Sequence, residues 1–265
     1  DGDLKCGIGA RLINIAVPNT VKIFSYMRCA TSKHIDKIDF EAGAYGQCKA
    51  DGSFVNMIVP ENLQIDFKTR NGQDVKFLNF LKARILDQPP IRKFSPRRGL
   101  KHLPKHLSDL IGRVYHGELR VMRKDGSIMS RKEGNGIINQ CIKGTVDPEV
   151  AKRIFFTAWD SVTIDEFYNG YSDTAYATRF FTCVQLVNAV ANSKYVQLIK
   201  NKIVYSKEEA YAYFRQLRSE GEEGEVVKDA KGIWEDNQSG SHHCIKIKHS
   251  FECDVKVVDW KYGKK

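Results

Sequence analysis

The hexapeptide Gln-Cys-Lys-Ala-Asp-Gly at positions 47–52 contains the residue best suited to covalent chemistry. Lys49 lies at the end of an expected strand, and Gly52 lets the backbone approach another group closely. A lysine amine becomes a nucleophile when neighbouring cations, a metal or desolvation lower its pKa from about 10.4. Taken alone, however, the hexapeptide is better explained by a surface lysine beside a turn.

Two more lysines lie near the C-terminal end, where Lys246 and Lys248 alternate with the apolar Ile245 and Ile247. Because alternate side chains of a strand point to the same face, both ammonium groups would share one face. There they could neutralise a phosphate and lower the pKa of a nearby lysine. A solvent-facing basic edge strand is the alternative interpretation.

Three further segments contain residues that suit a nucleotide, a sugar or a metal. In chain order they are Tyr115-His116-Gly117-Glu118-Leu119, Thr157-Ala158-Trp159-Asp160 and Glu223-Gly224-Glu225-Val226-Val227-Lys228. Together with 47–52 and 245–248, they resemble five of the six motifs of the covalent nucleotidyltransferase superfamily, in the same order. That superfamily comprises ATP-dependent DNA ligases, RNA ligases and mRNA-capping guanylyltransferases. Each motif is weak alone, whereas the ordered set is specific.

A longer segment narrows the resemblance. Residues 131–162 (RKEGNGIINQCIKGTVDPEVAKRIFFTAWDSV) resemble the corresponding part of the T-even bacteriophage DNA ligases, as do residues 3–7 and 232–239. The resemblance implies an α+β nucleotidyltransferase fold, the ATP-grasp-like fold of ligase adenylation domains, with antiparallel sheets flanked by helices. It implies a lead-in or linker from an upstream domain over 1–43, an adenylation domain over 44–249, and the start of a truncated or absent OB-fold domain over 250–265.

The resemblance also implies a reaction. Lys49 would attack the α-phosphate of ATP, expel pyrophosphate and hold AMP through a phosphoramide bond. AMP would then pass to a 5′-phosphate at a nick in duplex DNA, and the 3′-hydroxyl would displace it. Such transfers depend mainly on positioning and charge neutralisation.

Roles for other residues follow from the same resemblance. Lys246 and Lys248 would bind the phosphates. Glu118 would accept a hydrogen bond from a ribose hydroxyl. With Glu223 it would also bind the divalent metal, Mg2+, which prefers carboxylate oxygen. Trp159 would stack on adenine, although a buried core aromatic is nearly as good an interpretation. Gln47 would help to read the adenine edge.

DNA contacts are expected in two places. Thr69-Arg70-Asn71-Gly72 resembles the Ser-Arg-x-Gly element of the family, so Arg70 would bind a DNA phosphate. The second place is a basic cluster that includes Arg92, Arg97 and Arg98, for which a solvated loop is an equal alternative.

The sequence departs from the family pattern at Phe54. The first motif normally continues Lys-x-Asp-Gly-x-Arg, but here Ser53 and Phe54 follow Gly52. Phe54 cannot supply the missing charge, so a compensating cation is needed for efficient strand joining. Because some RNA ligases accept other residues there, an RNA ligase is the first alternative, and a catalytically weak nucleic-acid-binding module is the second.

Composition agrees with a soluble globular enzyme. The 42 basic and 32 acidic residues give a net charge of +10, which favours a polyanionic partner. The most apolar stretch, 180–191, is too short and too polar to span a membrane. Seven cysteines without a C-x-x-C pair favour free thiols, and His242-His243-Cys244 is better interpreted as strand than as zinc ligands. We expect a monomer in the cytoplasm of a bacterial or phage-infected cell.

Local patterns predict the elements that position these residues. Strands are expected at 53–59, 63–68, 113–122, 154–160, 195–205, 225–229, 244–248 and 253–260. Helices are expected around 10–17, from Asp74, and from Ser206 to about Gly221, where Ser206 and Glu209 would form a capping box.

Overall fold

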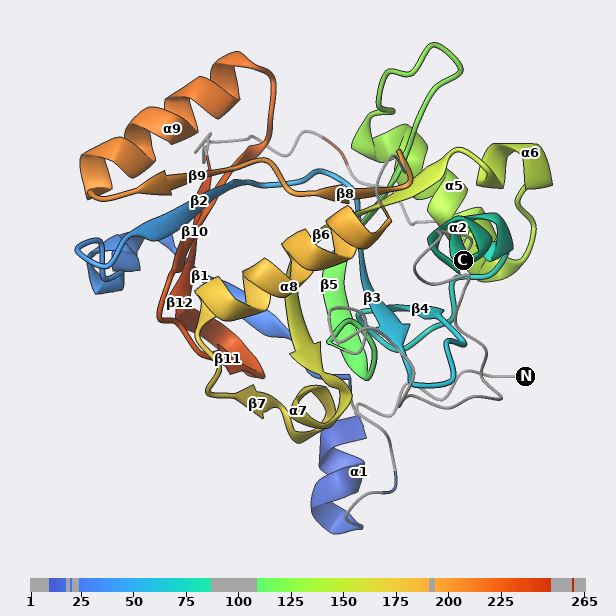
Figure 1. Ribbon diagram of the computed structural model, residues 1–265, viewed down its shortest axis with the longest axis horizontal. Coiled ribbons are helices and arrows are strands. Elements are labelled where there is room, and N and C mark those ends of the chain that lie inside the picture. Colours follow the sequence, from blue (N-terminus) through green and yellow to red (C-terminus); the bar gives the residue numbers. More distant parts are fainter. Residues whose placement is uncertain are drawn as a thin grey trace.

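Two five-stranded sheets form the framework of the computed structural model, which describes residues 10–17, 20, 24–86, 109–190, 194–248 and 259. Figure 1 shows the sheets on either side of a central space, with helices on their outer sides and α8 (Tyr176–Ala189) crossing between them. No helix among these residues is both long enough and apolar enough to cross a membrane.

The first sheet carries Lys49 and the lysines of its C-terminal strand. Its strand order is β1 (Met27–Thr31), β12 (Asn237–Lys248), β10 (Gly224–Asp229), β2 (Ala44–Cys48) and β9 (Asn201–Val204). Only the β1–β12 pair is parallel. Helix α9 (Lys207–Ser219) packs on one face through Ala210 and Phe214, and η1 (Ser32–Lys37) packs near β12.

The second sheet carries Glu118 and Trp159. Its strand order is β4 (Asp66–Thr69), β3 (Ser53–Val59), β5 (Arg113–Val121), β6 (Ile154–Thr163) and β8 (Val196–Leu198), with β6 and β8 parallel. The largest core cluster lies between this sheet and α2 (Asn79–Leu86), α5 (Arg131–Lys143), α6 (Pro148–Ala151) and α8. Three small elements, α7 (Ile164–Asn169), β7 (Tyr171–Ser172) and β11 (Trp234–Glu235), lie beside it, and α1 (Ala10–Ala16) extends below the sheets in Figure 1.

The expected α+β fold is confirmed, with local corrections, one of which is that the strand expected at 63–68 is β4, Asp66–Thr69. The helix expected from Asp74 begins at Asn79, because Val75 N–H donates to Phe67 O and Asp74 pairs with Lys68. The single strand expected over 195–205 is two strands, β8 and β9, that belong to different sheets. Within the expected lead-in 1–43, Met27–Thr31 forms an edge strand of the first sheet.

The start of α9 also differs in detail from the expected capping box. Ser206 Oγ accepts from Glu209 N–H at 3.1 Å, as predicted. The Glu209 carboxylate, however, accepts from Tyr205 N–H at 2.9 Å instead of from Ser206. The expected strand 253–260 lies outside the described residues apart from Asp259.

Candidate active site

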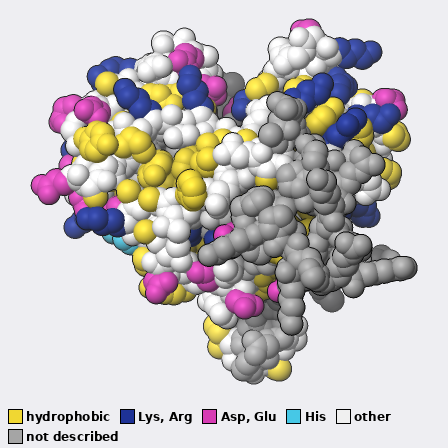
Figure 2. Space-filling view, viewed as in Figure 1, with side chains coloured by type: hydrophobic (Ala, Val, Ile, Leu, Met, Phe, Trp, Pro, Cys, Tyr) yellow, Lys and Arg dark blue, Asp and Glu magenta, His cyan; other side chains and the backbone are white. Residues whose placement is uncertain are grey.

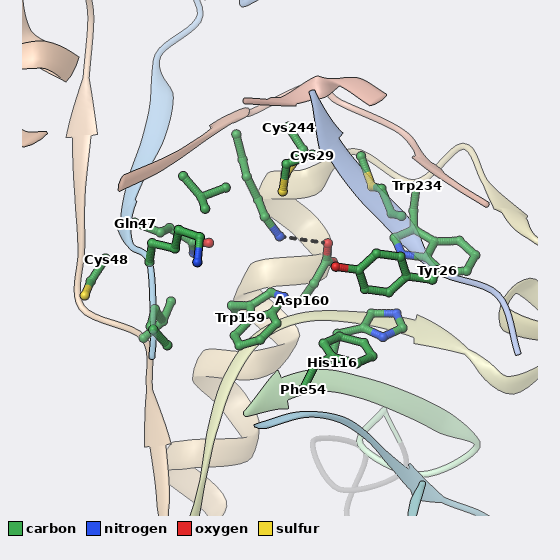
Figure 3. A pocket seen from close by; sticks show the side chains of 16 residues that line it. Tyr26, Cys29, Gln47, Cys48, Phe54, His116, Trp159, Asp160, Trp234 and Cys244 are labelled. Carbon is green, nitrogen blue, oxygen red and sulfur yellow. Dashed lines mark hydrogen bonds and ion pairs between the residues drawn. The ribbon is translucent and has the colours of Figure 1, made fainter. Parts of the chain in front are cut away.

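A cavity of about 140 Å³ lies between the facing sides of the two sheets (Figure 3). Its walls come from both sheets, including β1, the edge strand of the first sheet. The lining residues are Tyr26, Met27, Cys29, Gln47, Cys48, Lys49, Ala50, Phe54, His116, Trp159, Asp160, Ile199, Val226, Lys228, Trp234 and Cys244. Predicted site residues Gln47, Lys49 and Trp159 are therefore brought together.

Lys49 lies directly after β2 and forms an ion pair with Glu223. Its Nζ is 2.5 Å from Glu223 Oε2, and each side chain is about one-quarter exposed, at 25% and 26%. The pairing of β2 with β10 brings the two residues together, and Lys49 N–H donates to Gly224 O at 2.9 Å. A Cβ on Gly224 would lie 2.4 Å from Ile247 O, so this approach of strands requires glycine.

Glu118 lies on β5 opposite Phe54 of β3 and Thr157 of β6. Its Oε2 is buried and has no hydrogen-bond partner among the described residues. Burial raises the pKa of Glu118 to about 7, although the positive charge of Lys49 opposes the shift. Glu118 is thus near Lys49, and its carboxyl group is poised to exchange a proton near neutral pH.

Gln47 and Trp159 are connected through Tyr176 of α8. Gln47 Nε2 donates to Tyr176 Oη at 2.6 Å, and Tyr176 Oη donates to the Trp159 carbonyl at 2.7 Å. Gln47 is buried, whereas Trp159 is partly exposed. Its ring can therefore meet a planar ligand in the cavity, while the Gln47 amide group is held by the protein.

Lys246 and Lys248 lie on the cavity side of β12, but neither lines the cavity itself. Lys246 pairs with Val226, which does line it, and Lys248 pairs with Gly224 at the Lys49 end of the sheet. Lys246 instead lines a neighbouring groove of about 750 Å³ together with Arg28. The register of β12 therefore confirms that the two lysines share a face, as expected from alternation.

Sequence reasoning missed a buried ionic cluster at the base of the cavity. Asp160 Oδ1 accepts from Arg179 Nε at 2.9 Å, and Asp160 Oδ2 accepts from Lys228 Nζ at 3.2 Å. Burial alone would raise the pKa of Asp160, but the two cations hold it well below its usual range. Asp160 and Lys228 lie in the quoted motifs, whereas nothing in the sequence singled out Arg179.

Phe54 forms an aromatic wall of the cavity. Its ring centroid is 5.0 Å from that of Tyr26, 6.0 Å from Trp159 and 6.3 Å from His116. The guanidinium carbon of Arg70 lies 3.9 Å from the Tyr26 ring centroid, so a cation lies one ring away from Phe54. His116 adds no charge at neutral pH, because burial lowers its pKa to about 4.

The expected DNA-contacting residues are only partly described. Arg70 is exposed at the end of β4, whereas Arg92, Arg97 and Arg98 lie outside the described residues. Figure 2 shows Lys and Arg side chains on both sides of the notch between the lobe of α9 and the lobe of α5 and α6.

The carboxylates fit a metal that phosphates would help to hold. Among the described residues, no three or more His, Cys, Asp or Glu side chains cluster in a way that could hold a metal alone. Mg2+, however, commonly binds one or two carboxylates together with substrate phosphates and water. The unpartnered Oε2 of Glu118 and the solvent-accessible carboxylate of Glu223 suit that donor set.

Comparison with known proteins places the fold and motifs in one family. Residues 26–248 match the model of the ATP dependent DNA ligase domain. The DNA ligases of Enterobacteria phages T4 and T6 are each 26% identical over 273 residues, covering 97% of this chain and 55% of the relative. The chain thus spans about half the length of these curated relatives.

A solved structure shares the fold. The ATP-dependent DNA ligase from bacteriophage T7, in complex with ATP, matches with a TM-score of 0.61 and 15% identity, over 87% of this chain and 69% of that chain. The superfamily expected from the ordered motifs is confirmed. The chain belongs to the ATP-dependent DNA ligase domain family.

Proposed function

We propose that this chain is the adenylation domain of an ATP-dependent DNA ligase, in which Lys49 accepts AMP from ATP. One observation carries the proposal: Lys49 lines a cavity between two sheets and lies 2.5 Å from an acidic residue. The aromatic ring of Trp159 and the aliphatic Val226 enter the same cavity from opposite sheets. Adenine would bind between these two side chains, with its phosphates toward Lys49.

The chemical step forms a nitrogen–phosphorus bond. The neutral amine of Lys49 attacks the α-phosphorus of ATP, the bond to the bridging oxygen breaks, and pyrophosphate leaves while Nζ loses a proton. Because Lys49 now pairs with Glu223, the ion pair must open before the amine can attack. Lys246 and Lys248 would neutralise phosphate charge from the same face of the sheet.

Two carboxylates would serve the metal and the sugar. Glu223, with Glu118, would hold Mg2+, which when bound supplies charge neutralisation of the phosphates. Glu118 would also accept a hydrogen bond from a ribose hydroxyl, a role for which its unpartnered oxygen is suited. Gln47 would contact the adenine edge while Tyr176 holds its amide nitrogen.

The complete enzyme would transfer AMP to a 5′-phosphate at a DNA nick and seal it with the 3′-hydroxyl. Arg70 and the basic side chains on both sides of the notch in Figure 2 support contact with duplex DNA. We assign residues 26–249 to the adenylation domain, because β1 belongs to its first sheet, with 1–25 as a lead-in and 250–265 as the start of an OB-fold domain. The enzyme would act as a monomer in the cytoplasm of a bacterial or phage-infected cell.

An RNA ligase of the same superfamily is the second candidate. The observation in its favour is Phe54, which packs in an aromatic wall where the DNA ligases carry arginine. Sealing assays on a nicked DNA duplex and on nicked or single-stranded RNA separate the two. Joining of RNA alone would replace the DNA ligase proposal.

The test is an intact-mass measurement after incubation with Mg2+ and ATP, with GTP and NAD in parallel. We expect an AMP-sized gain from ATP alone, mapped to Lys49 by peptide analysis. Lys200 is exposed, and its carbonyl accepts a hydrogen bond from Cys48 N–H at 2.8 Å, next to Lys49; it should remain unmodified. If no gain appears, a longer chain that includes the flanking domains is tested, and failure there would leave a non-catalytic binding module.

A further inference from the structure

Two cysteines from distant parts of the sequence meet in the wall of the cavity. The Sγ atoms of Cys29 on β1 and Cys244 on β12 are 2.9 Å apart. Figure 3 shows both side chains beside one another at one edge of the cavity. No role in the proposed adenylation requires either thiol.

An irregularity in β12 produces this contact. Cys29 pairs with Ser241, but the next residue, Ala30, pairs with Ile245, so residues 242–244 form a bulge. Gly240 has a φ of 109°, and a Cβ there would lie 3.0 Å from the Ala30 backbone. The bulge therefore depends on a close approach of β1 and β12, and it turns Cys244 toward Cys29.

The surroundings favour a thiolate at Cys29. A hydrogen bond from the Cys244 thiol and the charges of Lys228 and Lys246 lower the pKa of Cys29 to about 7, against the effect of burial. Burial instead raises the pKa of Cys48 to about 12 and that of Cys141 to about 11. Among the described cysteines, Cys29 thus has the most nucleophilic setting.

Small oxidants have a route to Cys29. Cys29 lines both the cavity and the neighbouring groove of about 750 Å³. Cys244 is buried and lines the cavity but not the groove. Because Cys29 is the more accessible of the two thiols, we expect peroxide to react there first and Cys244 to form the disulfide afterwards.

We propose that Cys29 and Cys244 form a reversible disulfide when the protein meets hydrogen peroxide, and that this disulfide and a bound nucleotide oppose one another. The Cys29 thiolate attacks one peroxide oxygen, the O–O bond breaks, and hydroxide leaves, giving a sulfenic acid. The Cys244 sulfur then displaces the sulfenic hydroxyl, which leaves as water with the thiol proton. Overall, two thiols lose two electrons and two protons, and peroxide becomes two waters.

The opposition between the disulfide and a bound nucleotide depends on the nucleotide site proposed above. A nucleotide in the cavity would cover Cys29, and its phosphates would repel a thiolate beside Lys228 and Lys246. Both effects would slow the attack of Cys29 on peroxide while a nucleotide is bound. The bond also ties β1 to β12 two residues before Lys246, which restricts the strand that carries the phosphate-binding lysines.

In the experiment, the reduced full chain is treated with hydrogen peroxide in the absence of metal, once with saturating ATP and once without ATP. Disulfides are then mapped by peptide mass spectrometry. We expect a Cys29–Cys244 peptide that dithiothreitol abolishes, formed several-fold more slowly with ATP because the nucleotide covers Cys29. Cys141→Ser should leave this product unchanged, whereas Cys29→Ser and Cys244→Ser should each abolish it. A product that joins other cysteines would overturn the proposal.

Formation of the AMP adduct separates this proposal from the proposed function. If reduced protein forms the adduct and oxidised protein forms it equally fast, the opposition between disulfide and nucleotide is wrong while the adenylation stands. If the disulfide forms but reduced protein neither binds ATP nor forms an adduct, the proposed function fails and the disulfide stands. A slower adduct in oxidised protein, restored by dithiothreitol, supports both.

Discussion

Lys228 Nζ lies 3.2 Å from Asp160 Oδ2, and this ion pair joins the two five-stranded sheets at the base of the cavity. Lys228 belongs to β10 of the first sheet and Asp160 to β6 of the second. Arg179 of α8 binds the same carboxylate, so one buried anion holds two buried cations and three elements together. Two cations with one carboxylate leave a net positive charge, and one of these cations, Lys228, lines the cavity proposed for a nucleotide.

Replacing the shared anion tests this arrangement. Asp160→Asn should lower the free energy of unfolding by about 3–5 kcal/mol, because Lys228 and Arg179 would remain buried without their counter-charge. Urea unfolding measures the loss, and the exposed Asp173→Asn provides the matched control. A loss below about 1 kcal/mol would show that water or another group already compensates the cations.

The proposed nucleophile is tested by removing its amine. Lys49→Ala should abolish the AMP adduct while leaving affinity for duplex DNA largely intact, because phosphate contacts from other basic residues remain. Intact-mass spectrometry and a DNA-binding titration measure the two effects. Lys200→Ala removes an exposed lysine near the same sheet and should leave the adduct unchanged. An adduct that persists in Lys49→Ala would refute the assignment.

Strand patterns were readable from the sequence because they are local. The strand predicted over 53–59 has the same bounds as β3. Alternation also predicts that Lys246 and Lys248 share one face of β12, as they do. The ordered motifs predict that Lys49, Glu223 and Trp159 share one site, and in the structure Lys49 contacts Glu223 and lines the cavity together with Trp159. Each of these inferences depends on neighbours in the chain or on a resemblance that spans it.

Contacts between sheets were not readable in this way. Arg179 reaches Asp160 from α8, and Cys29 meets Cys244 only because β12 bulges against β1. Long-range register decides such contacts, and no local periodicity encodes it. The late start of α2 has a similar cause, since Val75 continues to pair with Phe67 before the helix begins.

Phe54 offers a gain-of-function prediction. Phe54→Arg should change stability little, because the side chain is partly exposed and an arginine can stack on the Tyr26 and Trp159 rings. If the missing charge limits turnover, the variant should seal nicks faster in a chain that carries the flanking domains. Phe54→Leu controls for loss of the ring. No gain would indicate that another cation, such as Arg70, already fills the role.

Arg70 is exposed and is one of the residues proposed to bind a DNA phosphate. Arg70→Ala should weaken duplex binding and reduce the magnitude of the slope of log affinity against log salt by about 1, as expected for one lost phosphate contact. Arg70→Lys keeps the charge but loses the planar stack on Tyr26, so it should retain the slope and lose part of the affinity. An unchanged slope in Arg70→Ala would remove Arg70 from the DNA interface.

Glu225 predicts how stability depends on pH. It faces α9, away from the cavity, and neither carboxylate oxygen has a hydrogen-bond partner among the described residues. It fits there only because position 46 is glycine, since a Cβ on Gly46 would lie 2.3 Å from Glu225 Oε1. Burial raises the pKa of Glu225 to about 8, so the folded state binds more protons than the unfolded state from roughly pH 4.5 to 8.

The contribution of Glu225 to stability is therefore greatest at low pH and is lost as pH rises toward 8. Glu225→Gln cannot titrate, so its free energy of unfolding relative to wild type should rise between pH 5 and pH 8, by at most about 4 kcal/mol at ~1.4 kcal/mol per pKa unit. Urea unfolding at three pH values measures this difference, and the exposed Glu61→Gln should run parallel to wild type. Parallel curves for Glu225→Gln would mean that the carboxyl group is solvated in the folded protein, because only a solvated group would keep its ordinary pKa.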